Sequence, residues 1–163
     1  MAFTLVLIRH GDAKPREYGQ DDFDRELTDE GIKALRAAFP KHLSLVEVTK
    51  ATELWMSKAV RARQTAEIAN ETLGISTFRE FGSMYEQDQG RFLEHLSKCS
   101  ADTVVAVGHI PFVEDLCALL TGTFLDFSTG GAAAVEISDK DMAQIATGRV
   151  HGRLLWFIQG PKV

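Results

Sequence analysis

The chain has 163 residues, of which 45% are hydrophobic and 25% are charged, the balance of an ordinary globular protein. Its formal net charge of -5 argues against a nucleic-acid or membrane-surface partner, because proteins that bind those surfaces carry a basic face. No stretch of the sequence is apolar for long enough to span a bilayer.

The first predicted element is a buried strand at 3–9, an apolar run that ends in Arg9. A polar loop follows. Thr28 then predicts the start of a helix, since a threonine precedes two acidic residues in the first turn, where they favour the helix dipole. Pro40 predicts the end of this helix or a kink in it, because proline cannot donate a helical hydrogen bond.

The middle of the chain predicts a second strand at 52–56 and a helix that follows it to about Leu73. Ser57 is expected to cap that helix, and Gly74 stands where a C-terminal glycine belongs. A short strand is expected at 76–81. A further helix is expected at about 89–98, where Phe92, Leu93 and Leu96 form its apolar face.

The clearest buried strand of the chain is the run at 103–107. Gly108, His109 and Pro111 then open another helix, with the proline near its first position. Two late strands are expected at about 131–137 and 153–158, separated by a polar segment.

Strands that alternate with helices predict an α/β fold, a three-layer sandwich with a mostly parallel central sheet. The continuous apolar runs at 3–8 and 103–107 are typical of strands that are covered on both faces. No repeat or linker interrupts the pattern, so we expect a single domain over 1–163. Cys99 and Cys117 have neither disulfide nor metal-ligand spacing, and two reduced thiols favour a cytoplasmic location.

Four polar side chains are expected to meet beyond the carboxyl ends of the strands, where open α/β sheets bind ligands. Arg9 and His10 end the first strand, His109 follows the strand at 103–107, and Arg61 lies one helical turn after Ser57. Arginine makes paired bonds to phosphate oxygens, and a neutral imidazole can accept a phosphoryl group covalently. Flanking arginines should keep that imidazole neutral near pH 7. The combination predicts phosphoryl transfer through His10.

Three further residues have two interpretations each. Arg25 could fold over the site as a third positive group, or lie on the surface beside an acidic residue. Ser57 could bond the phosphate, although a helix cap is the better interpretation. Gly11 is expected to let the backbone approach the ligand closely, and could also be a plain turn glycine.

The sequence lacks the motifs on which other classes of phosphatase depend. Neither cysteine has an arginine six residues later, so the loop of cysteine-dependent phosphatases is missing. Asp22 and Asp24 have the spacing of an aspartyl-phosphate motif, but they lie in a polar loop. No phosphate-binding loop of the Gly-x-x-x-x-Gly-Lys type and no metal-ligand cluster occurs in the sequence. We therefore expect a reaction without a metal or other cofactor.

At these positions the sequence resembles the histidine phosphatase superfamily, and within it the small phosphohistidine phosphatases of the SixA type. The resemblance implies a phosphoglycerate mutase-like fold, with His10 as nucleophile and Arg9, Arg61 and His109 as the phosphate pocket. It implies Arg25 as a helper. Larger members use a carboxylate as general acid, for which Glu86 is the candidate here, with Asp12 behind it. The segments that carry the resemblance are 7–13, 25–31, 57–66 and 107–111, followed by 120–122, 129–130 and 155–157.

The favoured expectation is a phosphatase that acts on phosphohistidine displayed by a partner protein. A chain of this length has no room for a large lid, and an open pocket can admit such a substrate. A small-molecule phosphomonoesterase or mutase remains an alternative, since an open pocket also admits small phosphate esters. A non-catalytic phosphate-binding module is the third possibility.

Overall fold

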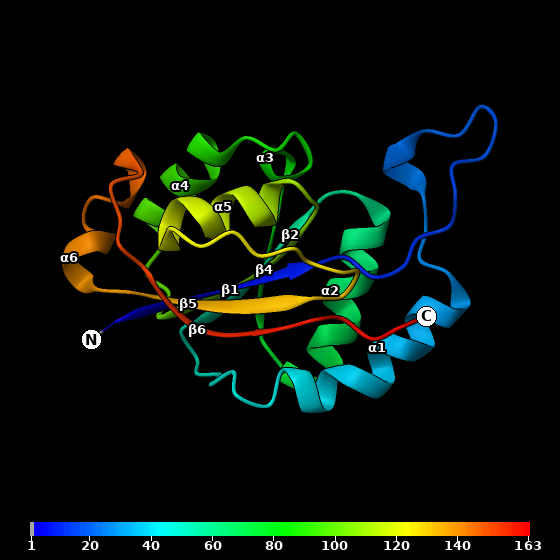
Figure 1. The fold of residues 1–163 in the computed structure, drawn as a ribbon, viewed down its shortest axis with the longest axis horizontal. Helices are drawn as coiled ribbons and strands as arrows, with labels where there is room; N and C mark the ends of the chain where they lie inside the picture. Colours follow the sequence, from blue (N-terminus) through cyan, green and yellow to red (C-terminus); the bar gives the residue numbers. More distant parts are fainter. Residues whose placement is uncertain (1) are drawn as a thin grey trace.

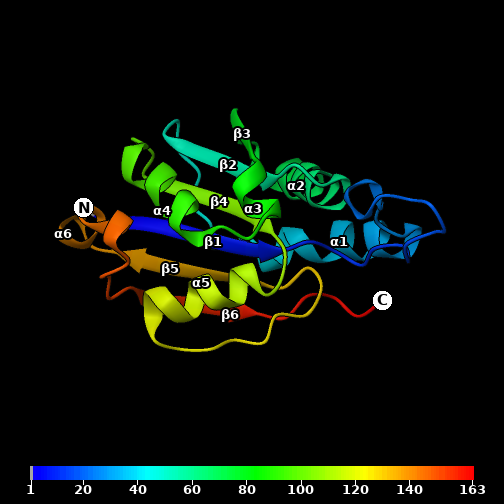
Figure 2. The same cartoon turned by 90° about the horizontal axis from the view of Figure 1, so that it is seen from above.

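Six strands form one sheet in the computed structural model, which describes residues 2–163. They are β1 (Phe3–Arg9), β2 (Thr52–Ser57), β3 (Thr77–Phe81), β4 (Thr103–Gly108), β5 (Ala132–Ile137) and β6 (Arg153–Ile158). The order across the sheet is β3-β2-β4-β1-β5-β6 (Figure 2). The pairs among β3, β2, β4 and β1 are parallel, whereas β5 runs antiparallel to both β1 and β6. The predicted mostly parallel sheet is confirmed.

Helices cover both faces of this sheet, and Figure 1 shows α3, α4 and α5 above the strands and α1 and α2 below them. One face carries α1 (Asp29–His42) and α2 (Val60–Leu73). The other carries α3 (Gly82–Tyr85), α4 (Gln89–Lys98) and α5 (Phe112–Thr121). The remaining short pieces are α6 (Asp139–Met142) and the 3₁₀ turns η1 (Asp22–Asp24) and η2 (Ile145–Thr147).

The pleat of β1 explains why both layers are needed. Successive side chains of a strand point to opposite faces. Leu5 and Leu7 therefore lie in the core under α4 and α5, while Val6 and Ile8 lie in the core under α1 and α2. All four are almost completely buried, so a strand in this position has to be apolar throughout. The three-layer architecture expected from the apolar runs is confirmed.

Of three helix boundaries, one agrees with expectation and two differ in detail. Thr28 does cap α1, since its hydroxyl oxygen accepts the N–H of Gly31 at 2.9 Å. Pro40 does not end that helix, which continues to His42, because a proline in the last turn removes one hydrogen bond without stopping the chain. Pro111 lies at the N-cap of α5, after a cis peptide bond from Ile110.

Ser57 is not the cap that the sequence predicts. It is the last residue of β2 and is completely buried, and α2 begins three residues later with Ala59 as N-cap and no side-chain cap bond. The hydroxyl group of Ser57 instead contacts His109 on the neighbouring strand end. The short helix α3 was not predicted either, because four residues are too few to show a helical period.

The sheet register brings three strand ends to one level. Arg9, the last residue of β1, pairs with Gly108, the last residue of β4. On the other side of β4, Val107 pairs with Met56 of β2. Because these strands are parallel, the residues that come after them emerge at the same edge of the sheet. Neighbouring strands lie only about 5 Å apart, so side chains on these ends can contact one another.

Within residues 2–163, no helix is long and apolar enough to cross a membrane. The same residues contain no group of three or more His, Cys, Asp and Glu side chains placed to hold a metal ion. Cys99 and Cys117 are both unpaired thiols.

Candidate active site

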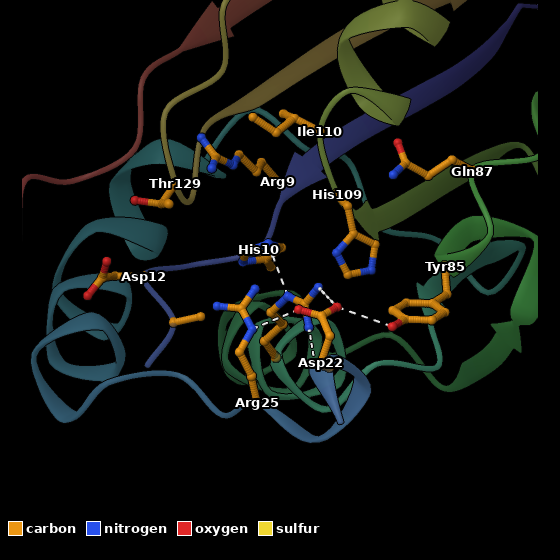
Figure 3. Close-up of a pocket in the computed structure, with 12 residues that line it drawn as sticks. Arg9, His10, Asp12, Asp22, Arg25, Tyr85, Gln87, His109, Ile110 and Thr129 are labelled. Atoms are coloured by element: carbon orange, nitrogen blue, oxygen red, sulfur yellow. Dashed lines mark hydrogen bonds and ion pairs between the residues drawn. The ribbon is translucent and has the colours of Figure 1, made fainter. Parts of the chain in front are cut away.

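A cavity of about 570 Å³ opens at the carboxyl ends of β1, β2 and β4 (Figure 3). The loop between β1 and α1, dark blue in Figure 1, projects beyond the same edge of the sheet and contributes to its wall. The structure thus brings together the four side chains that the sequence predicts to meet, and Arg25 with them. The charged and imidazole groups in the lining are Arg9, Arg25, Arg61, His10, His109, Asp12 and Asp22.

His10 follows β1 directly, and its orientation is set by one hydrogen bond. Its ring Nδ1–H donates to the carbonyl oxygen of Gly11 at 2.8 Å, so the lone pair of a neutral ring lies on Nε2. Burial, together with the charges of Arg61, Arg9 and Arg25, lowers the pKa of His10 from 6.5 to about 4, although the hydrogen bond to Gly11 acts in the opposite direction. The imidazole is therefore neutral at pH 7 and has an unprotonated nitrogen available for nucleophilic attack.

Arg61 lies beside that nitrogen. Its Nε–H donates to the Nε2 lone pair of His10 at 3.4 Å, although the two residues are 51 positions apart in the sequence. Arg61 is on the first turn of α2, so the helix that comes after β2 brings its guanidinium group back over the end of β1. The side chain is only 6% exposed. A buried arginine in this position supplies fixed positive charge next to Nε2 of His10.

His109 faces His10 across the cavity, with the ring centroids 5.2 Å apart in an edge-on arrangement. Its Nε2 lies 2.8 Å from the hydroxyl oxygen of Ser57. Burial, together with His10 and Arg61, lowers the pKa of His109 to about 3. When Ser57 donates to Nε2, the single proton of the neutral ring is on Nδ1. This Nδ1 is buried and has no hydrogen-bond partner among residues 2–163.

Arg9 is the last residue of β1 and is held from behind. One terminal N–H donates to the carbonyl oxygen of Phe127 at 2.9 Å. The backbone N–H of Phe127 in turn donates to the buried carboxylate of Glu114 at 2.9 Å. Nε of Arg9 is buried and finds no partner within the described chain. The lining of the cavity thus contains two buried polar groups whose hydrogen-bonding capacity the protein itself leaves unused.

Asp22 is a functional candidate that sequence reasoning missed. Its carboxylate accepts the Nε–H of Arg25 at 2.9 Å and an Nη2–H of Arg61 at 3.0 Å, and the hydroxyl group of Tyr85 donates to it at 3.1 Å (Figure 3). Burial raises the pKa of the Asp22 carboxyl, but Arg61, Arg25 and Tyr85 outweigh it and hold the net pKa below the usual value. The group is ionised at pH 7. The one sequence signal was its spacing of three residues from Arg25.

Both interpretations of Arg25 apply. Its side chain lines the cavity as a third positive group, and it also pairs with an acidic neighbour, Asp22. A terminal N–H of Arg25 donates to the carbonyl oxygen of Lys14 at 3.0 Å, which fixes the guanidinium group from the loop side.

Gly11 serves packing rather than ligand approach, contrary to expectation. A Cβ at this position would lie 2.6 Å from Cδ1 of Leu35, so a larger residue at position 11 would force the Leu35 side chain of α1 to shift. The backbone N–H of Gly11 donates to the hydroxyl oxygen of Thr65 at 3.0 Å and is not directed at the cavity. Gly11 is absent from the cavity lining.

Glu86, the sequence candidate for a general acid, is exposed and does not line the cavity. Its neighbours Tyr85 and Gln87 do. Gln87 has a φ of 60°, unusual for a residue other than glycine, and its side-chain oxygen accepts the N–H of Phe112 at 3.1 Å. This turn directs the phenol and the amide toward the cavity and leaves the carboxylate outside.

The carboxylates that do line the cavity are both engaged. Asp22 is held by two arginines. Asp12 accepts the hydroxyl group of Thr28 at 2.8 Å, on the side of the cavity remote from His109 (Figure 3). The wall beside His109 is formed by Tyr85, Gln87 and Ile110, which are neutral at pH 7.

Comparison with known proteins identifies a family and a shared fold. The family model described as histidine phosphatase superfamily (branch 1) matches residues 5–98. A search of curated protein sequences found no match. Among solved structures, the protein histidine phosphatase SixA complexed with tungstate has 23% identity and a TM-score of 0.76, covering 96% of this chain and 97% of that one.

Two other solved structures extend the comparison. A protein from Nakamurella multipartitia, assigned as a phosphohistidine phosphatase SixA, has 26% identity and a TM-score of 0.75, covering 100% of this chain and 98% of that one. A mycobacterial glucosyl-3-phosphoglycerate phosphatase has 15% identity and a TM-score of 0.69, covering 99% and 100%. The shared fold therefore extends over essentially the whole length of each chain.

Proposed function

Because this chain belongs to the histidine phosphatase superfamily, we propose that it removes the phosphoryl group from phosphohistidine on a partner protein and carries that group on His10. The observation that supports the proposal most directly is the state of His10. Its Nδ1–H is bound by the Gly11 carbonyl, which leaves the Nε2 lone pair in a cavity lined by three arginines. This arrangement suits attack on phosphorus, where the charge to be stabilised lies on the phosphoryl oxygens.

In the first step, Nε2 of His10 attacks phosphorus and the phosphorus–nitrogen bond of the substrate breaks. The phosphoryl oxygens are bound by Arg9, Arg61 and Nδ1–H of His109. The departing imidazole of the substrate takes the bonding electron pair. The new phosphohistidine at His10 acquires positive charge on its ring, which the Nδ1–H bond to the Gly11 carbonyl stabilises.

In the second step, a water molecule attacks the phosphoryl group on His10 from the open side of the cavity. The bond from phosphorus to Nε2 breaks, inorganic phosphate leaves, and the electron pair returns to Nε2. A proton from the attacking water passes to the phosphate product. His10 is then neutral again, and because its pKa is about 4 it remains so at pH 7.

The chemistry of the leaving group favours phosphohistidine over phosphate esters. An alcohol leaves a phosphate ester as a poor leaving group and needs a proton donor. In contrast, an imidazole protonated at its other nitrogen leaves as a neutral molecule. The wall beside His109 offers a phenol and an amide, and Asp22 is ionised. A site of this composition suits a substrate that needs no general acid, and its openness suits a histidine displayed on a protein.

The alternative is a phosphatase or mutase for small phosphate esters. The likeness to the glucosyl-3-phosphoglycerate phosphatase supports a shared fold, but it does not indicate a shared substrate. The two SixA structures have higher TM-scores and identities, which supports the phosphohistidine assignment. We further propose that residues 1–163 act as one domain and that the protein works in the cytoplasm, which its two unpaired cysteines support. We also propose that turnover needs no metal, which the use of His10 as nucleophile supports.

A substrate panel tests the proposal. Wild type and His10→Ala are compared on a phosphohistidine carrier protein, sugar phosphates and phosphoglycerates, with and without chelator. The expected result is turnover of the carrier protein by wild type, an acid-labile phosphoenzyme trapped by rapid quench, and neither in His10→Ala. Faster turnover of the small esters would favour the alternative function. Full activity of His10→Ala would exclude His10 as the nucleophile.

A further inference from the structure

Asp22 contacts three other side chains that line the cavity. Its carboxylate joins Arg25 on its own loop, Arg61 on α2 and Tyr85 on α3. Its backbone carbonyl oxygen also accepts an Nη1–H of Arg61 at 2.8 Å. One residue thereby links three side chains of the cavity lining that come from three separate elements.

The geometry of Arg61 shows what this link does. Both terminal nitrogens of the guanidinium group bond to Asp22, one to the backbone oxygen and one to the carboxylate. The plane of the group is therefore fixed from the side of the loop. Its remaining edge, with Nε, is directed at Nε2 of His10 at 3.4 Å. A guanidinium group that is held on one edge presents its other edge in a defined orientation.

Arg25 is held in the same way. Its Nε bonds to Asp22 and one terminal nitrogen bonds to the Lys14 carbonyl, and its charge lies near enough to His10 to contribute to the low pKa of that imidazole. The turn η1 has no fully buried residue, and its one apolar side chain, Phe23, packs edge-on against the ring of Tyr85 with the ring centroids 5.3 Å apart. The contacts of Asp22 with Arg61 and Tyr85 attach the turn to the body of the protein, together with this ring contact of Phe23.

We infer that Asp22 is a positioning residue, whose carboxylate holds the guanidinium groups of Arg25 and Arg61 toward His10 so that they are preorganised for an incoming phosphoryl group. The inference rests on the proposed function for its catalytic consequence. Preorganised charge stabilises a transition state without reorganising during the reaction, and two long, flexible side chains lose that advantage when their common anchor is removed.

The test compares Asp22→Asn with Asp24→Asn. The two substitutions remove the same charge from the same turn, but Asp24 is exposed and does not line the cavity. Tungstate, a tetrahedral dianion, serves as the probe of the anion site and is titrated by calorimetry into each variant. We expect Asp22→Asn to weaken tungstate binding about tenfold and to lower kcat on phosphohistidine by about 10². Asp24→Asn should match wild type within about twofold.

A double-mutant cycle separates positioning from a general effect on folding. In an Arg61→Met background, Asp22 no longer has the guanidinium group of Arg61 to position. The loss of tungstate affinity caused by Asp22→Asn should therefore shrink several-fold. An undiminished loss in that background would overturn the inference. Tungstate binding by Asp22→Asn that equals or exceeds wild type would also overturn it, since the carboxylate would then compete for the arginines instead of positioning them.

The calorimetric readout keeps the two proposals distinguishable. If wild type turns over no phosphorylated substrate but Asp22→Asn still weakens tungstate binding, the proposed function fails and the positioning role stands. If His10→Ala is inactive and Asp22→Asn retains full kcat and affinity, the positioning role fails and the proposed function stands. Failure of wild type to bind tungstate at all counts against both.

Discussion

The hydroxyl oxygen of Ser57 lies 2.8 Å from Nε2 of His109, and the two residues sit at the ends of the neighbouring strands β2 and β4. The same hydroxyl oxygen accepts the N–H of Ala59 at 3.3 Å, so its own proton is free to go to the histidine. When this proton goes to Nε2, the single proton of the neutral His109 ring is on Nδ1. Ser57 is not part of the cavity lining, so in the proposed reaction it would act through His109.

Ser57→Ala should therefore affect activity more than stability. Losing one buried hydrogen bond costs about 1 kcal/mol of unfolding free energy, and an unfixed His109 tautomer should lower kcat about tenfold. Ser83→Ala is the matched control, because Ser83 is also buried but its hydroxyl group has no partner in the described chain. We expect Ser83→Ala to change stability by less than about 1 kcal/mol and leave kcat unchanged. Equal kcat in both variants would contradict the role given to Ser57.

The two buried histidines predict how stability depends on pH. In the folded chain the pKa is about 4 for His10 and about 3 for His109, against 6.5 for an unperturbed histidine. Below pH 6.5 the unfolded chain therefore binds more protons than the folded chain, so the free energy of unfolding falls as pH falls from 6.5 toward 4. The expected loss is of the order of a few kcal/mol for the pair.

Urea denaturation at about pH 7 and about pH 5 measures this loss. The matched variant is His10→Gln/His109→Gln, which retains polar side chains of similar size but cannot titrate. Its stability should fall less than that of wild type over the same pH interval. The same fall in both proteins would assign the pH dependence to other groups.

Gly11→Ala should destabilise the fold, because the added Cβ would lie 2.6 Å from Cδ1 of Leu35. Overpacking of this kind costs about 1–3 kcal/mol. Shortening the opposing side chain with Leu35→Val should recover part of that loss in the double variant. Gly82→Ala is the control, since nothing lies within 4 Å of its added Cβ. Thermal unfolding of the four variants tests the prediction, and a Gly11→Ala protein as stable as wild type would refute it.

Glu86 and Gln87 test which residue faces the leaving group. Glu86→Gln should leave turnover within about twofold of wild type, because its side chain lies outside the cavity. Gln87→Ala should lower kcat/KM about tenfold, since it removes an amide from the wall and the acceptor for the Phe112 N–H. Steady-state kinetics on a phosphohistidine protein measures both. A tenfold loss of turnover in Glu86→Gln would contradict this prediction and support Glu86 as a general acid.

The sequence determined the layers of the fold because its pattern is strong. The apolar runs of β1 and β4 have no polar face, and such strands are stable only between two helical layers. The sequence also placed His10 and His109 directly after those strands, and parallel strands that run side by side deliver their next residues to one edge of the sheet. For this reason the two imidazoles and Arg61 could be expected to meet from the order of the residues alone.

Tertiary structure alone decided the contacts that depend on loops and on small differences in chain direction. Asp22 lies in a polar loop whose sequence has no period, and only the folded chain brings it against Arg61 on α2. Ser57 is a residue type that commonly caps helices, but His109 after β4 lies close enough to form a hydrogen bond with its hydroxyl group. Whether Glu86 or Gln87 enters the cavity depends on one residue with positive φ. Local propensities do not encode such choices, because the deciding partner is distant in sequence.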